Sequence, residues 1–109
     1  MKQLSFYIIL WNFTEQGIKS LKDCLHSIVI FKAHVERRGN PYNGTFYPAG
    51  QYDAVSLIQA DDDNSVRECV LEAEKDGNVR STTLKPISQE EGKEFENTVH
   101  ELFRVSSIN

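Results

Sequence analysis

The stretch "AGQYDAVSLIQADDD", residues 49–63, does most to decide the fold. Its middle, residues 51–60, is rich in β-branched and apolar side chains and predicts a strand. Gly50 in front of it favours the turn of a hairpin with the preceding segment. The acids from Asp61 onward are typical of a helix start, because carboxylates cap the first amide groups and complement the helix dipole. We therefore expect a hairpin strand that leads directly into a helix.

The segments on either side complete a βαββαβ order with one more helix at the C-terminal end. Predicted strands cover residues 4–13, 42–50, 51–60 and 79–87, and predicted helices begin at Thr14, at residues 61–64 and at Ser88. This order is typical of the ferredoxin-like split-βαβ fold. Its four antiparallel strands lie in the order 4-1-3-2, with both main helices on one face. We expect an α+β protein that forms one domain over residues 1–109.

The first predicted helix runs from the N-cap Thr14 to the basic turn before Gly39, as cap and stop signals indicate. Apolar side chains at helical spacing predict the stripe that packs on the sheet. They are Ile18, Leu21, Leu25, Ile28 and Val35, with Cys24 and Phe31 beside them. Gly17 lowers helix propensity in the first turn, which favours a close approach of another backbone. The last predicted helix opens with a capping box of Ser88 and Glu91.

The face of the sheet that the two main helices leave open is expected to be apolar. Strand 4–13 has apolar side chains at both parities, and we assign Tyr7, Ile9 and Trp11 to the open face. An antiparallel sheet covered on one side ordinarily carries polar residues on the other. Covering an apolar face of roughly 300 Å² contributes several kcal/mol. We therefore expect a homodimer in which a second copy covers this face, with the C-terminal helix as the rival cover.

The composition argues against several partners. The chain has 109 residues and a net charge of −4, and it lacks the clustered basic face that nucleic acids or anionic membranes require. No signal peptide or membrane-spanning run is visible, so we expect a cytoplasmic protein. Cys24 and Cys69 have no metal-binding spacing. We expect them to be reduced core thiols, and we expect neither a metal nor a cofactor.

Three stretches resemble the GYD-domain family: "YIILWNFTEQGIKSLKD" at residues 7–23, "AGQYDAVSLIQADDD" at 49–63 and "GNVRSTTLKPIS" at 77–88. They stand in the family's order and spacing, and the resemblance extends to about residue 95. It implies a ferredoxin-like fold of the dimeric α/β-barrel superfamily and face-to-face dimers, and it implies no particular reaction. The sequence departs from the family at Gln51 in the name motif and at Pro48, in a segment that is usually a regular strand. Pro48 leaves the shape of the hairpin open.

Antiparallel pairing brings residues that are distant in sequence to one end of the sheet. The start of strand 51–60 should lie beside the end of strand 4–13, and strand 79–87 should start at the same end. The candidate ligand-binding residues are Asp53, Arg80, Asn12, Tyr52, Gln51, Trp11 and Tyr7. The first helix is expected to present unpaired N–H groups at this end. Apolar walls with few polar groups are the ordinary form of a small-ligand site.

Five of these seven residues also have a structural interpretation, which we favour, and Gln51 is too common a residue type to weigh. Asp53 either fixes the hairpin through an ion pair or turn amides, or contacts a ligand. Arg80 either pairs with Asp53 or binds an anion. Tyr52 fits a core or interface position as well as a proton donor. Tyr7 and Trp11 fit dimer contacts as well as the stacking of a cofactor.

The function expected from the sequence is that of a homodimeric small-molecule-binding protein. The catalytic alternative is a cofactor-independent oxygenase or isomerase, in which Asp53 acts as general base and Arg80 or Asn12 holds an oxyanion. A purely structural dimerisation module is the third interpretation. A cavity beside Asp53 would distinguish a binding or catalytic protein from the third.

Overall fold

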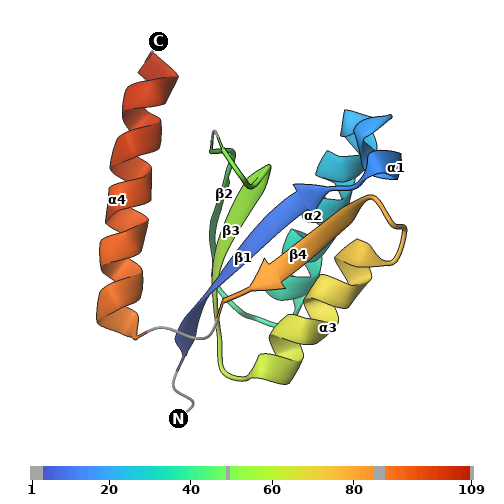
Figure 1. The fold of residues 1–109 in the computed structure, drawn as a ribbon. Coiled ribbons are helices and arrows are strands. Elements are labelled where there is room, and N and C mark those ends of the chain that lie inside the picture. Colours follow the sequence, from blue (N-terminus) through green and yellow to red (C-terminus); the bar gives the residue numbers. More distant parts are fainter. Residues whose placement is uncertain (1–3, 49, 85–87, 109) are drawn as a thin grey trace.

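The computed structural model describes residues 4–48, 50–84 and 88–108 (Figure 1). Its elements in chain order are β1 (Ser5–Phe13), α1 (Glu15–Ile18), α2 (Leu21–Arg37), β2 (Tyr42–Phe46), β3 (Ala54–Ala60), α3 (Asp63–Glu74), β4 (Val79–Thr83) and α4 (Gln89–Ile108). The strands form one antiparallel sheet in the order β2-β3-β1-β4. The predicted ferredoxin-like α+β fold and its strand order are therefore confirmed.

The connection between β2 and β3 is longer than the tight hairpin that the sequence predicts. β2 ends at Phe46 and β3 begins at Ala54. Pro48 has no N–H group to donate to a strand ladder, which favours an early end of β2. Gly50 lies in the loop with a φ of +126°, a backbone conformation that residues with a Cβ atom rarely adopt. Residues 85–87 of the predicted fourth strand lie outside the described part of the chain.

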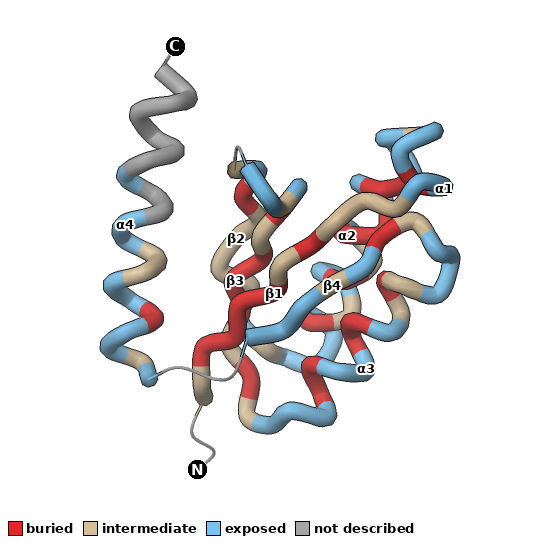
Figure 2. Tube along the Cα trace, in the orientation of Figure 1, coloured by how far each residue is buried: buried red, intermediate tan, exposed pale blue. Residues whose placement is uncertain are grey.

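Helices α2 and α3 cover one face of the sheet, and α4 stands along the other (Figure 1). The larger core cluster lies between the sheet and the α2–α3 layer, and Figure 2 shows buried segments along β1, β3 and both helices. Phe31 of α2 packs edge-on against Trp11 of β1, with ring centroids 5.2 Å apart. No helix in the described residues has the length and apolar character to cross a bilayer.

β1 orients its side chains opposite to the assignment made from the sequence. Tyr7, Ile9 and Trp11 are buried in the core beneath the helices, so the expectation that they lie on the open face is wrong. Both parities of β1 are apolar, and alternation alone therefore could not assign the faces. The register pairs Trp11 with Ala54 and Ile9 with Ser56. These small residues of β3 leave room for the large side chains of β1 under the helix layer.

The predicted first helix is in fact two helices. Thr14 caps α1 as predicted, but α1 ends at Ile18, and Ser20 has an extended backbone before α2 begins. The break changes the helical register, so Ile18, Leu21 and Leu25 of the predicted stripe are 67%, 57% and 37% exposed. The residues that α2 buries are Cys24, Ser27, Ile28, Phe31 and Val35. The predicted stripe is therefore correct only in its second half.

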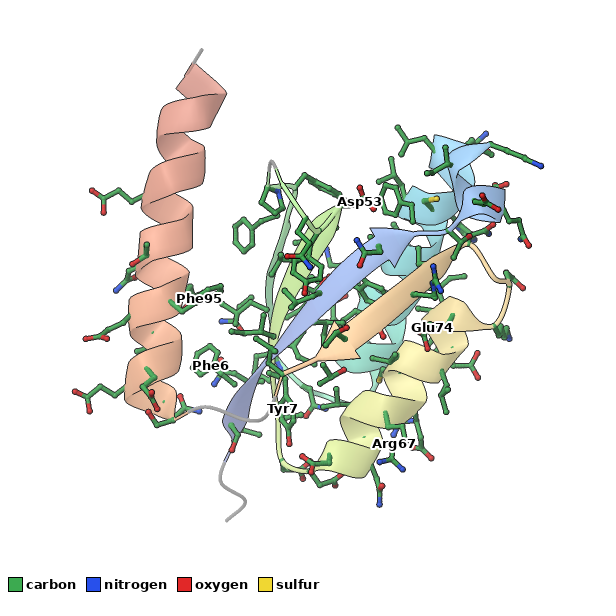
Figure 3. All side chains as sticks on the ribbon, viewed as in Figure 1. Phe6, Tyr7, Asp53, Arg67, Glu74 and Phe95 are labelled. Atoms are coloured by element: carbon green, nitrogen blue, oxygen red, sulfur yellow. The ribbon has the colours of Figure 1, made fainter. Side chains whose placement is uncertain are left out.

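α4 covers part of the face opposite α2 and α3. A Cβ atom on Gly92 would come within 2.1 Å of the Phe6 ring, and Figure 3 shows Phe95 of α4 beside Phe6. The predicted capping box is present, with Glu91 N–H donating to Ser88 Oγ at 3.1 Å. This second cluster buries Phe6, Ile8, Phe46 and Leu57, with Leu10, Val55 and Phe95 partly buried beside them. The C-terminal helix is thus the cover of this face around Phe6.

Both cysteines are free and buried, as predicted. Burial raises the pKa of the Cys24 thiol and of the Cys69 thiol. A raised pKa keeps a thiol protonated at neutral pH, and the thiolate is the reactive form. Both residues are therefore packing residues of the core.

Candidate functional site

Asp53 lies at the end of β1, where the antiparallel topology predicts it. Its carboxylate accepts a hydrogen bond from Phe13 N–H at 2.8 Å, and its own N–H donates to the Trp11 carbonyl at 2.9 Å. The side-chain amide of Asn12 donates to the Gln51 carbonyl at 3.0 Å. These hydrogen bonds tie the loop before β3 to the end of β1.

The other predicted residues at this end do not gather around Asp53. Arg80 pairs in register with Asn12 and is exposed, and among the described residues it forms no ion pair with Asp53. Tyr52 is half-buried in the loop, and Trp11 is fully buried, with its indole N–H donated to a serine of β3. Asp53 itself is exposed. An exposed carboxylate that holds a backbone amide is a structural clamp, whereas a general base requires desolvation.

The start of α1 is closed by the turn before β4. Thr14 N–H donates to the Asn78 carbonyl at 3.1 Å, and the Thr14 hydroxyl donates to the Gly77 carbonyl at 2.7 Å. Gly17 N–H donates to Thr14 Oγ1 at 3.0 Å, so the expectation of unpaired N–H groups is wrong for this residue. A Cβ atom on Gly17 would lie 2.2 Å from the Asn78 carbonyl oxygen. The close approach predicted for Gly17 is therefore confirmed.

A hollow of about 460 Å³ lies between α3 and β4, away from Asp53. Its apolar wall contains Val66, Val70, Leu71 and Leu84, and of the predicted site residues Tyr7 lines it (Figure 3). A volume of this size, with an apolar wall and few polar groups, is within the range of small-ligand sites. The hollow is therefore the better candidate site.

The hydroxyl of Tyr7 donates to Asp63 Oδ1 at 2.6 Å. Asp62 positions this carboxylate, because it caps α3 by accepting from Ser65 N–H at 2.7 Å and so places Asp63 in the first turn. Burial, the hydrogen bond to Asp63 and the charge of Asp63 raise the pKa of Tyr7 well above its ordinary value. Tyr7 is therefore a neutral hydroxyl at physiological pH, held toward the hollow by the acid beside it.

Two further charges of α3 border the hollow. Arg67 and Glu74 both line it, on the helix face that also carries Val70. Figure 3 labels Arg67, which lies one turn into α3, and Glu74, which is the last residue of this helix. Glu74 Oε2 accepts a hydrogen bond from the Ser81 hydroxyl at 2.9 Å, which links α3 to β4. The hollow is thus lined by a cation, Arg67, and by a hydrogen-bonded carboxylate, Glu74, seven residues farther along α3.

Replacing Tyr7 by phenylalanine tests the hydrogen bond to Asp63. At neutral pH we expect the free energy of unfolding to fall by about 1 kcal/mol, because the bond is lost while Asp63 stays solvated. The pKa of Tyr7 is raised on folding. Its contribution is therefore complete below the ordinary tyrosine pKa of about 10 and is lost as the pH rises toward the folded value.

Urea unfolding of wild type and Tyr7→Phe from about pH 7 to about pH 11 measures this linkage. The stability difference between the two proteins should narrow above about pH 10, because only the wild type has this phenol to ionise when unfolded. A difference that stays constant or widens would show that the Tyr7 hydroxyl is not held by Asp63.

The sequence pattern identifies part of this site. Tyr7 is a predicted candidate, though on the wrong face, and Asp63 is predicted only as part of a helix start. Arg67 and Glu74 are absent from the prediction. Their spacing was the available signal, because positions 63, 67, 70 and 74 recur every three or four residues and share one face of a helix. This face of α3 borders β4 across a hollow. The hollow depends on how the two elements pack, which the spacing of residues within one helix does not determine.

Comparison with known proteins points to one family. A family model of the GYD domain matches residues 7–95. Among solved structures, an unknown protein from Galdieria sulphuraria has 12% sequence identity, with 80% of this chain and 47% of that chain covered and a TM-score of 0.49. The chain therefore spans about half the length of that structure. No curated protein matches the chain.

Proposed function

The chain belongs to the GYD-domain family, and we propose that it is a homodimeric protein that binds a small molecule in the hollow between α3 and β4. The observation that carries this proposal is the make-up of the hollow, an apolar wall with the hydrogen-bonded pair of Tyr7 and Asp63. Small-molecule sites combine such a wall with a few polar groups that fix the ligand's orientation. The residues of this site carry the proposal, because a fold alone does not specify a function.

Exposed leucines at the hollow support its role as a binding site. Leu71 is 56% exposed and Leu84 is 40% exposed, and both line the hollow. A ligand that covers roughly 100 Å² of apolar surface gains about 2–3 kcal/mol from its removal from water. The Tyr7 oxygen can also accept a hydrogen bond from a ligand while its hydrogen is donated to Asp63.

Binding is favoured over catalysis by the surroundings of Asp53. In the catalytic alternative Asp53 is the general base, yet its carboxylate is exposed and holds Phe13 N–H. Proton abstraction at neutral pH needs a carboxylate whose pKa is raised by desolvation. We therefore assign Asp53, Asn12 and Gln51 to a clamp that holds the loop before β3 against β1.

The homodimer of this proposal forms through the part of the open sheet face that α4 leaves uncovered. Leu10 and Val55 of the sheet are only partly buried, as is Phe95 of α4, and Leu10 pairs in register with Val55. A two-fold axis through this patch places the same apolar residues of two copies together. The apolar area removed from water stabilises the pair. Asn12 and Arg80, which pair in register farther along β1, then border the interface.

Obstructing the hollow tests the ligand site. We expect Leu71→Trp to weaken the binding of small-molecule hits at least about tenfold, because the indole occupies space that the ligand needs. The measurement is a fragment screen against ¹⁵N-labelled protein, with the amide signals of Val66 and Val70 as the readout. Leu21→Trp is the matched control, since Leu21 is 57% exposed against 56% for Leu71 and lies on α2. Hits that bind Leu71→Trp as tightly as wild type would count against the hollow.

A further inference from the structure

The α3 wall of the hollow carries charges of both signs. Arg67 and Glu74 both line it, and their seven-residue separation corresponds to about 10 Å along the helix axis. Val70 and Leu71 lie between them on the same wall. A ligand that follows α3 from Arg67 to Glu74 therefore meets a guanidinium, an apolar stretch and a carboxylate in turn.

The acidic groups of this lining outnumber the basic ones. Asp63 accepts from the Tyr7 hydroxyl and Glu74 accepts from the Ser81 hydroxyl, and these uncharged donors leave both negative charges in place. Arg67 forms no ion pair with any residue that the structure describes. Two carboxylates against one guanidinium give the lining a negative balance, so a ligand with one positive charge complements it.

We propose that the hollow takes an elongated amphipathic amine. Its ammonium group lies at Glu74, its apolar middle lies along Val70 and Leu71, and an oxygen acceptor lies at Arg67. This inference rests on the proposed function, because it names the ligand class of the same hollow. Glu74 has a second carboxylate oxygen that can accept from an ammonium group, and the guanidinium of Arg67 offers several N–H donors. Charge-assisted hydrogen bonds at both ends are stronger than neutral ones.

The charges around each end select this orientation. Asp63 lies one helical turn from Arg67, so a ligand carboxylate at that end would meet a like charge, whereas an uncharged oxygen acceptor would not. At the other end Lys75 follows Glu74 in sequence, but its ammonium pairs with Glu72 at 3.1 Å. At this end, Glu74 is therefore the lining carboxylate that can take a cationic ligand group.

Three probes of similar length separate the two polar contacts. The molecule 6-aminohexanamide carries both the ammonium group and the acceptor, hexylamine carries only the ammonium group, and hexanamide carries only the acceptor. Each is titrated to about 50 mM into the full ¹⁵N-labelled chain, because probes this small bind weakly. The readouts are the amide signals of Val66, Val70 and Leu71. We expect 6-aminohexanamide to bind about tenfold more tightly than hexanamide, with hexylamine in between.

Substitutions at the two ends should affect different probes. Glu74→Gln keeps an oxygen for Ser81 but removes the charge, so it should weaken 6-aminohexanamide and hexylamine about tenfold and leave hexanamide unchanged. Arg67→Gln should weaken both amides and leave hexylamine unchanged. Glu68→Gln makes the same charge change on the same helix, and Glu68 pairs with Arg38 at 2.8 Å instead of with a group near Glu74. It is the control and should alter none of the three.

The outcomes test the proposed ligand class and the proposed binding site separately. If hexanamide binds as tightly as 6-aminohexanamide and Glu74→Gln changes neither affinity, the proposed amine ligand is overturned. The hollow then remains a binding site for another class of ligand. If no probe shifts the signals of Val66, Val70 and Leu71, both the ligand class and the site are overturned. The ordered loss of affinity described for Glu74→Gln and Arg67→Gln supports both.

Discussion

Replacing Gly17 by alanine is expected to lower the free energy of unfolding by about 3 kcal/mol or more. A Cβ atom at this position would lie 2.2 Å from the Asn78 carbonyl oxygen and 2.7 Å from Cys24 Sγ. The Asn78 carbonyl accepts from Thr14 N–H, and Cys24 is fully buried, so neither neighbour moves aside at low cost. Either α1 or the turn before β4 must shift, and the contact that closes this end of the sheet is lost.

The sign of the effect distinguishes this contact from ordinary helix propensity. In a solvated helical turn, glycine to alanine stabilises a protein by about 0.5–1 kcal/mol. Chemical denaturation of wild type, Gly17→Ala and the exposed neighbour Lys19→Ala measures the difference. The Lys19→Ala control should stay within about 0.5 kcal/mol of wild type. A Gly17→Ala protein as stable as wild type would mean that α1 and the turn at Asn78 are not in contact.

Replacing Val55 by glutamate is expected to convert the proposed homodimer to a monomer. Val55 is partly buried beside Leu10 and Phe95, so the isolated chain can turn a carboxylate toward water. In the proposed dimer the two-fold axis brings two such carboxylates together away from solvent, which should weaken association at least about a hundredfold. Sedimentation equilibrium at micromolar concentration should give about twice the 12.5 kDa chain mass for wild type and 12.5 kDa for the variant.

A second glutamate substitution locates the interface. Leu21 is 57% exposed, and the exposed Leu25 and Val29 follow it at four-residue spacing on α2, so the three share one apolar surface of that helix. Leu21→Glu should leave the dimer intact, since that surface faces away from the open side of the sheet. Dissociation by Leu21→Glu alone would move the interface to this helix surface. A mass of 12.5 kDa for the wild-type protein would contradict the proposed dimer.

The element order and the caps could be predicted because each depends on neighbouring residues. Thr14 and the pair Ser88 and Glu91 form their predicted caps, and Asp62 caps α3 within the predicted acidic run. A side-chain oxygen that satisfies an amide two or three residues away acts whatever the rest of the chain does. The antiparallel topology then brought Asp53 to the end of β1 as expected.

The assignment of faces could not be predicted in the same way. β1 is apolar at both parities, and only the packing of Trp11 on Phe31 under the helix layer decides its orientation. The first helix changes register at Ser20, so Leu21 and Leu25 became exposed although they share a helical spacing with Ile28. Both outcomes depend on contacts between elements, which periodicity within one element does not contain.

In the candidate site, too, the local features could be predicted and the contacts between elements could not. Asp63 is explained locally as part of a helix start, yet its contact with Tyr7 joins residues 56 positions apart. The hollow exists because α3 and β4 pack with a space between Val70 and Leu84. No local sequence pattern indicates such a space, and the sequence therefore favours a site at Asp53. In the structure the Asp53 carboxylate instead accepts a hydrogen bond from the backbone N–H of Phe13.

The position of a bound small molecule tests the proposed site most directly. The measurement is a set of intermolecular nuclear Overhauser effects between a bound fragment and the methyl groups of the labelled chain. We predict contacts to the methyls of Val66, Val70 and Leu71, which line the hollow of about 460 Å³ beside Tyr7. Contacts to Leu10 and Val55 instead, with none to the α3 valines, would place the ligand on the open face of the sheet and contradict the account.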